Sequence, residues 1–275
     1  MTRRSDALAL ARGDVRDGTA SIEHLLQVLG SRRVGPRVLA RALPEVHAGC
    51  AELLASLAAL GGALAVELEA DPEGLAAMRA LLDHAAARVG ELGTALALGR
   101  RAPATLDARE RLALEAVVRP IAGELATVVR LVDLLGAHVT SETTPIDFAD
   151  ALAGCGRPPG RRRADRIVVA AVDIRTGELR VSDAGLILEL LAFAVAAVVR
   201  AGVTAPRIVV EKGPDGFPVF TVQAGDRLAP TEGRELEVVL GDALPRETEV
   251  LRASARHAGI KLEITEAGQR VSLAL

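Results

Sequence analysis

The side chains of this sequence best suited to nucleophilic chemistry are its five histidines. His84 lies one step from a predicted apolar seam, so a helix at this point would project the imidazole into solvent. A neutral imidazole in such a position can attack an aspartyl phosphate. The alternative is an ordinary exposed histidine on a helix. The other four are expected to be surface or interface residues: His24, His47, His138 and His257.

Neither the histidines nor the cysteines indicate a metal site. His47 and Cys50 have the spacing of half a site, but no second pair of ligands completes a tetrahedral set. Cys50 and Cys155 lie far apart in unrelated contexts, which favours free thiols in a reducing compartment over a disulfide. Asp83 adjoins His84, but adjacent helix positions diverge by about 100°, so its carboxylate is expected to face solvent.

The composition is that of a globular protein and argues against nucleic acid as a partner. The chain is 50% hydrophobic and 25% charged, with a net charge of -3, so it has no general basic field. Four Phe and no Tyr or Trp leave no platforms on which single-stranded bases could stack. The basic cluster Arg161, Arg162 and Arg163 fits a solvated linker, with contact to nucleic-acid phosphate or an acidic partner as the alternative.

The sequence predicts a cytoplasmic protein without membrane contact. No apolar stretch near residue 1 has the length of a signal peptide, and the longest apolar run, 190–199, is only half a membrane span. The chain also lacks a nucleophile elbow, a Walker loop and a dinucleotide-binding fingerprint.

Apolar periodicity predicts that the first half of the chain is helical. Ser21 is the expected N-cap of a helix that ends at Gly30, and Pro36 and Pro44 suit the first turns of two further helices. Asp71 is the expected N-cap of the next one. Three apolar runs step by four and three, as in helices packed lengthwise: Val46, Cys50, Leu53, Leu57, Leu60 and Leu64; Met78, Leu82, Ala85, Val89, Leu92 and Leu96; Leu114, Val118, Ile121, Leu125, Val128, Val132 and Leu135.

The segment 71–155 is predicted to be an antiparallel helical hairpin. The breaker-rich stretch 99–103 separates its two helices, and Pro120 predicts a kink in the second. A hairpin cannot cover its own wide apolar stripe, so it needs either the helical region 1–70 or a second copy of itself. Homodimerisation is the simplest solution, and we expect a homodimer.

A linker rich in proline, glycine and arginine follows at 156–165. Beyond it, residues 166–275 show β-branched runs and turn signals, so the predicted fold class is α+β: a helical bundle followed by an α/β sandwich. The expected strands are 167–174, 178–181, 207–212, 217–223, 235–240, 260–265 and 269–275, and the expected helices are 183–201 and 246–257.

This order of elements resembles the dimerisation and ATP-binding halves of sensor histidine kinases, over roughly residues 71–275. The segment 124–135 looks like the second bundle helix of that family, and 145–152 like the stretch that leads out of it. The segment 178–183 is similar to the entry into the asparagine-bearing helix of the GHKL-type ATP-binding domain. The resemblance implies that His84 is the phosphoacceptor and that response regulators are partners. Residues 1–70 have no counterpart.

The chain departs from that family wherever the family binds nucleotide. A kinase of this kind holds magnesium and phosphates with an asparagine, and this sequence contains none; its segment 191–198 offers no oxygen ligand. Ala224 stands about where the adenine-reading aspartate would be, and 241–246 lacks the repeated glycines of a phosphate loop. We therefore expect no cofactor and no ATP hydrolysis. The residues after His84, three alanines and Arg88, also differ from the family's acidic residue and proline.

Three functions are compatible with these observations. The leading hypothesis is a homodimeric, non-catalytic histidine-kinase-like protein, a pseudokinase that acts as a scaffold or regulator by binding other proteins. The alternative is a histidine phosphotransferase that relays phosphoryl groups between response regulators through His84. The third is a DNA-associated regulator that uses the helical amino terminus and the arginines at 161–163.

Overall fold

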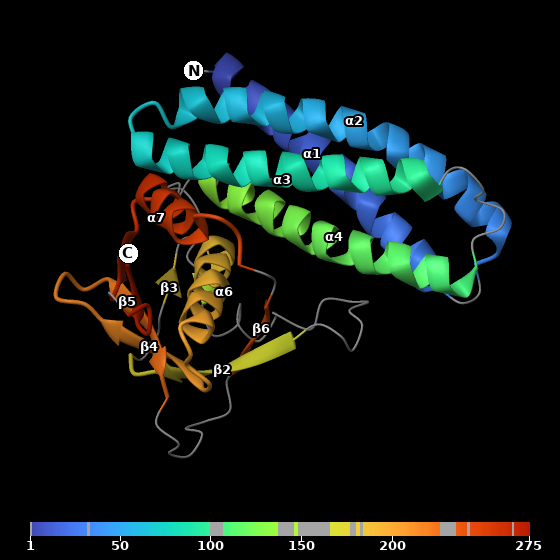
Figure 1. Ribbon diagram of the computed structural model, residues 1–275. Coiled ribbons are helices and arrows are strands. Elements are labelled where there is room, and N and C mark those ends of the chain that lie inside the picture. The colour runs from blue at the N-terminus through green and yellow to red at the C-terminus, as the bar shows by residue number, and fades with distance from the viewer. Residues whose placement is uncertain are drawn as a thin grey trace. The chain divides into compact units, whose positions relative to one another are not determined.

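The computed structural model of the chain describes residues 2–31, 34–99, 107–136, 146–147, 166–176, 180–181, 184–225, 235–240, 243–265 and 267–275. They form two compact units, residues 1–133 with 242–250, and residues 134–241 with 251–275. The architecture is α+β, as predicted: four helices, then a mixed sheet with helices (Figure 1). The predicted linker 156–165, with its three arginines, lies outside the described residues, as do His138 and Cys155.

Four long helices make up most of the first unit and are referred to together as the bundle. They are α1 (Thr2–Gly30), α2 (Pro36–Glu67), α3 (Pro72–Gly99) and α4 (Ala108–Gly136). The three apolar seams predicted from the sequence are confirmed, because every residue in them is buried. Steps of three and four put these residues on one face of each helix, and burial of that face stabilises the bundle.

Helix α1 begins much earlier than the sequence suggested, and the prediction that Ser21 caps it is wrong. Ser21 lies inside α1, where its hydroxyl donates to the carbonyl of Asp17. The reason is that Leu8, Ala11 and Val15 extend the buried face upstream of Ser21. Packing of this face outweighs the preference of serine for a helix start.

Pro44 does not begin a helix either, because Pro36–Glu67 is one continuous helix with Pro44 inside it. A proline inside a helix has no N–H, so one backbone hydrogen bond of the helix is lost. Leu39 and Leu43 before it and Val46 after it are all buried, so the apolar face runs through the proline without a break. Pro120 likewise lies inside α4.

Two aspartates cap the helices of the hairpin. The N–H of Gly74 donates to Asp71 Oδ1 at 3.0 Å, as expected for the N-cap of α3. At the start of α4, Asp107 Oδ1 accepts from the N–H groups of Arg109 and Glu110, and the Glu110 carboxylate accepts from the N–H of Asp107. This reciprocal arrangement is a capping box, which satisfies donors that a helix start leaves free.

Helix α1 is tied to both ends of α4. Asp133, near the end of α4, accepts from Arg12 and Arg16, each at 2.7 Å. At the other end, the half-buried guanidinium of Arg111 donates to four backbone carbonyls at and beyond the end of α1: Val28, Leu29, Ser31 and Val34. Helix α1 of the same chain therefore contacts α4, one of the two helices of the hairpin whose apolar stripe has to be covered. Homodimerisation stays a prediction.

One stretch of the described residues, Arg37–Glu67, is long and apolar enough to cross a membrane by length and composition alone. The core helix of a soluble protein passes the same test. In this helix the apolar residues from Val46 to Leu64 that step by three and four form the buried seam of the bundle. Of the most apolar 18-residue window in this stretch, 28% is buried in the structure, so packing within the chain covers only part of it.

The second unit contains a six-stranded sheet in the order β6-β2-β4-β5-β8-β7. Strands β2 and β4 are parallel and joined through α6, and the other neighbours are antiparallel. A short pair, β1 with β3, is separate. Strand β1 (Ile146–Asp147) was not among the predicted elements. The others lie close to the predicted ones: β2 (Arg166–Ile174), β3 (Arg180–Val181), α6 (Ala184–Arg200), β4 (Pro206–Lys212), β5 (Pro218–Ala224), β6 (Glu235–Leu240), α7 (Glu247–His257), β7 (Lys261–Ile264) and β8 (Val271–Ala274).

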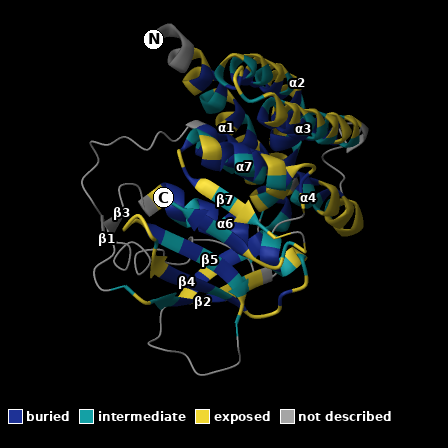
Figure 2. Cartoon of the chain, turned by 90° about the vertical axis from the view of Figure 1, so that its left-hand side faces the viewer, coloured by how far each residue is buried: buried dark blue, intermediate teal, exposed yellow. Residues whose placement is uncertain are grey.

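The core of this unit lies between α6 and one face of the sheet. Val210, Phe220 and Leu273 are register partners on adjacent strands, so their side chains share that face, and all three are fully buried. In Figure 2, much of α6 and of the central strands has the colour of buried residues. The opposite face is more polar: there Thr221 and Ser272 contact each other across β5 and β8.

Candidate functional site

His84 lies on α3 next to the buried seam of the bundle. Its neighbours on the seam, Leu81 and Ala85, are almost fully buried, whereas the side chain of His84 is 34% exposed. The expectation that the imidazole would project into solvent is therefore only partly right. The ring is half-buried because a side chain of α4, Glu124, contacts it.

The contact with Glu124 orients the imidazole. His84 Nε2 lies 3.2 Å from Glu124 Oε2, and the Glu124 side chain is only 11% exposed. A neutral imidazole that carries its proton on Nε2, the nitrogen nearest this carboxylate, keeps a free lone pair on Nδ1. This is the arrangement in which an acidic group selects one tautomer of a histidine and leaves its other nitrogen nucleophilic.

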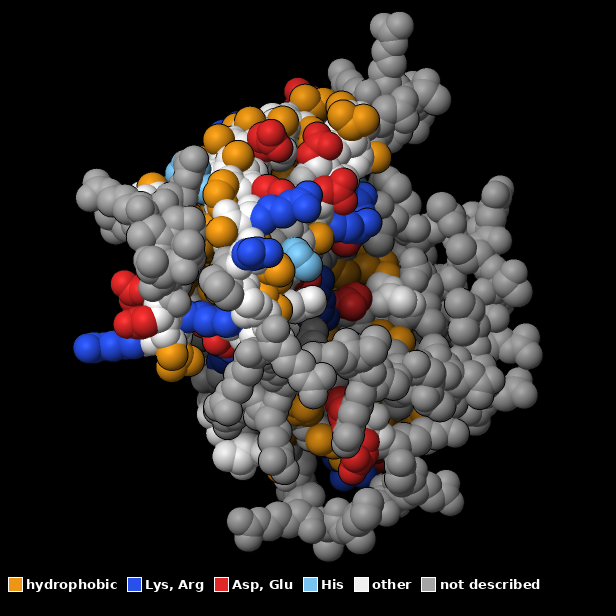
Figure 3. All heavy atoms as spheres, turned by 90° about the vertical axis from the view of Figure 1, so that its right-hand side faces the viewer, with side chains coloured by type: hydrophobic (Ala, Val, Ile, Leu, Met, Phe, Trp, Pro, Cys, Tyr) orange, Lys and Arg blue, Asp and Glu red, His pale blue; other side chains and the backbone are white. Residues whose placement is uncertain are grey.

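Arg88, one turn after His84 on α3, binds the same carboxylate. Its Nε donates to Glu124 Oε2 at 3.1 Å, and its Nη1 donates to Glu91. Burial lowers the pKa of Arg88, but the hydrogen bonds and charges of Glu124 and Glu91 outweigh burial, so its pKa is raised. Arg88 therefore stays a cation and holds Glu124 in place. On the face in Figure 3, a histidine side chain lies at the surface among basic and acidic ones.

The sequence led to His84 but not to Glu124. Asp83, the neighbouring carboxylate, is exposed, as predicted from the angle between adjacent helix positions. Glu124 comes from another helix, 36 residues after Arg88. Spacing within one helix cannot reveal such a partner. The sequence could have revealed this partner only through the alignment of the two helices of the hairpin. In that alignment Glu124, which precedes the buried Leu125, faces α3.

The structure describes three other histidines. His24 is exposed, and His47 and His257 are half-buried. Cys50 belongs to the buried seam, and burial raises the pKa of its thiol. Among the residues that the structure describes, no group of His, Cys, Asp and Glu side chains could hold a metal ion.

Helix α6, which includes the segment 191–198, contributes apolar side chains to the core of the sheet unit. Phe193, Ala194, Val195 and Val198 of α6 are buried. At the end of β5, Ala224 is exposed, and the next N–H, of Gly225, donates to the Ala205 carbonyl at 2.7 Å. The segment 226–234, and residues 241–242 of the segment that lacks the glycines of a phosphate loop, lie outside the described residues.

Comparison of the chain with protein-family models, with curated proteins and with solved structures finds no match. The geometry around His84 and the chemistry of its neighbours are therefore the observations that bear on function.

Proposed function

We propose that this chain is a cytoplasmic histidine phosphotransferase of histidine-kinase-like architecture, which exchanges a phosphoryl group with receiver domains of response regulators through His84. One observation carries the proposal: a half-exposed imidazole is paired through Nε2 with a nearly buried carboxylate, Glu124. An ordinary histidine on the exposed face of a helix does not require a nearly buried carboxylate beside it.

The expected chemistry begins with the Nδ1 lone pair of His84. This nitrogen attacks the phosphorus of an aspartyl phosphate on the receiver, so that an N–P bond forms while the P–O bond to the aspartate breaks. The aspartate leaves as a carboxylate, and the imidazole becomes a cation that keeps its Nε2–H. The carboxylate of Glu124, 3.2 Å from Nε2, stabilises the new positive charge. The reverse sequence returns the phosphoryl group to a second receiver.

The scaffold that the sequence favoured is the second candidate. It is supported by the apolar packing of α6, where Phe193 and Ala194 take the place of nucleotide ligands. In both readings the sheet unit binds proteins rather than ATP. A role at DNA ranks last, because its basic cluster at 161–163 lies outside the described residues and the net charge is -3.

The proposal is tested by incubating the chain with receiver domains that carry a radiolabelled aspartyl phosphate. We expect label on the chain that is labile in acid and stable in alkali, that mass spectrometry maps to His84, and that NMR places on Nδ1. Labelled ATP with magnesium should transfer nothing. Failure of transfer from every receiver tried would leave the scaffold, and labelling by ATP would contradict the loss of kinase activity.

The variant Glu124→Gln should slow phosphoryl transfer roughly 10- to 100-fold, because an amide of the same shape neither selects the tautomer nor balances the charge on the imidazole. The expected loss is in the transfer rate constant, with the concentration of receiver needed for half-maximal rate unchanged. Glu91→Gln is the matched control, since the exposed Glu91 contacts Arg88 but not His84. Equal rates for both variants would remove Glu124 from the mechanism.

A further inference from the structure

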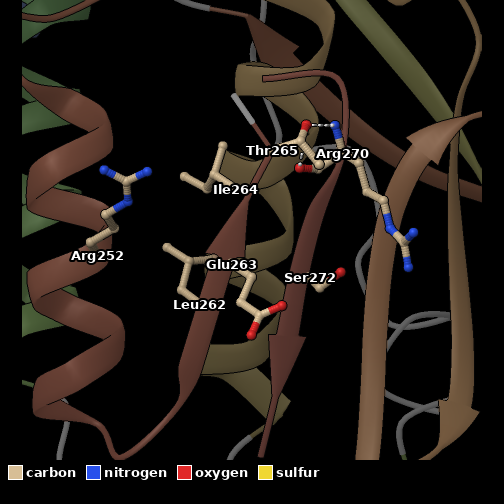
Figure 4. Close-up of a pocket in the computed structure, with 7 residues that line it drawn as sticks. All are labelled: Arg252, Leu262, Glu263, Ile264, Thr265, Arg270 and Ser272. Carbon is tan, nitrogen blue, oxygen red and sulfur yellow. Dashed lines mark hydrogen bonds between the residues drawn. The ribbon is translucent and has the colours of Figure 1, made fainter. Parts of the chain in front are cut away.

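The sheet ends at β7, a strand with one described partner. It pairs with β8 on one side, and no described strand pairs with its other side. A hollow of about 610 Å³ lies at this edge. Figure 4 shows the residues that line it: Arg252 of α7, then Leu262, Glu263, Ile264, Thr265, Arg270 and Ser272 of the hairpin.

The backbone of β7 offers free hydrogen-bonding groups along this edge. Thr265 and Arg270 are opposite each other, and the Thr265 N–H donates to the Arg270 carbonyl at 3.0 Å. In an antiparallel pair the direction of N–H and C=O groups alternates, so Glu263 also points them at β8. Leu262 and Ile264 therefore direct theirs outward, where an added strand would pair with them.

The side chains give the two faces of this edge different characters. Leu262 and Ile264 are half-buried and lie on the side of α7, where Arg252 also lies (Figure 4). Glu263, Arg270 and Ser272 lie on the other side of the hairpin. Side chains of a strand alternate between the two faces. A strand added at β7 would thus place apolar side chains against Leu262 and Ile264.

The charges of the edge favour an acidic partner. Glu263 is already engaged, because Lys261 Nζ lies 2.7 Å from its carboxylate. That hydrogen bond and the charge of Lys261 lower the pKa of Glu263. Arg252 and Arg270 add two positive charges to the lining of the hollow: Arg252 lies on the side of α7, and the Arg270 side chain extends on the far side of the hairpin (Figure 4). The edge therefore carries an excess of positive charge.

We infer that β7 is a docking edge for an extended acidic segment of a partner protein, added to the sheet as a further strand. Its side chains would alternate, with apolar residues facing Leu262 and Ile264 and acidic residues on the face of the hairpin that carries Lys261 and Arg270, while a terminal acidic group reaches Arg252. This inference is independent of His84, because it needs no phosphoryl transfer.

The probe is a fluorescent eight-residue peptide of alternating valine and glutamate, followed by anisotropy on the full chain. We expect this peptide to bind the parent chain saturably. Binding should be at least about tenfold weaker when the peptide alternates valine with lysine, and when the chain carries the double substitution Arg252→Glu/Arg270→Glu. Arg79→Glu, a reversal at an exposed position of α3, is the control and should bind as the parent does. Circular dichroism confirms that the variants fold.

Two N-methylated forms of the valine–glutamate peptide separate strand addition from simple charge attraction. Methyl groups on one set of alternate amides block pairing with β7, and those on the other set leave it intact. We expect one form to bind like the parent peptide and the other at least about tenfold more weakly. Equal binding of both forms, absence of saturable binding, or indifference to the arginine reversals would overturn the inference.

Discussion

Replacing His84 with glutamine should abolish the phosphoryl label that receivers transfer to this chain. We expect a loss of roughly 10⁴-fold or more, the scale seen when a nucleophile is removed from an enzyme. Glutamine has no nucleophilic nitrogen, because its amide lone pair is delocalised. Its NH₂ group can still donate to Glu124 and so replaces the imidazole in the contact between α3 and α4. The measurement therefore reports chemistry rather than folding.

The matched control for this result is His24→Gln. His24 is exposed on α1, so its loss should change neither the label nor the circular dichroism spectrum. Both variants are compared with the same receivers under initial-rate conditions. Label that persists on His84→Gln would place the acceptor elsewhere and would reduce the His84–Glu124 pair to a structural contact.

The second large effect is on stability. Arg111→Met should lower the free energy of unfolding of the bundle by about 3 kcal/mol, because one guanidinium donates to four carbonyls around the end of α1. Methionine retains much of the apolar stem but no donor. Without the guanidinium, the four half-buried carbonyls stay shielded from water but have no charged donor, so the cost of their desolvation is no longer offset.

Urea unfolding followed by circular dichroism at 222 nm measures this loss. Arg109→Met is the control, because Arg109 is exposed on the same first turn of α4, and its replacement should cost less than about 0.5 kcal/mol. An unfolding midpoint for Arg111→Met equal to that of the control would show that the four hydrogen bonds contribute no net stability.

The regular parts of this fold could be predicted because they repeat. The seam from Met78 to Leu96 recurs with the period of a helix, and β5 alternates between buried and less buried residues with the period of a strand. The Asp71 cap is a local signal and was also correct. Burial enforces such periods at every residue, so each element is supported by many positions at once.

The contacts between elements could not be predicted in this way. Ser21 and Pro44 have local preferences for a helix start, and both were overruled by apolar faces that continue past them. Glu124 and Arg111 act on groups of other helices, so no spacing in their own neighbourhood reveals them. The candidate site was therefore half predicted: its nucleophile follows from the sequence and its partner only from the fold.

The place of β8 in the sheet has a consequence for how the chain folds during synthesis. Strand β8 lies inside the sheet, between β5 and β7, and its Ser272 contacts Thr221 from 51 residues earlier. The sheet cannot close until the ribosome has released residues up to about 274, whereas α1 to α3 pack on their neighbours in sequence. We expect the bundle to form first and the sheet to follow slowly, with α6 and the edge of β5 exposed to chaperones in the interval.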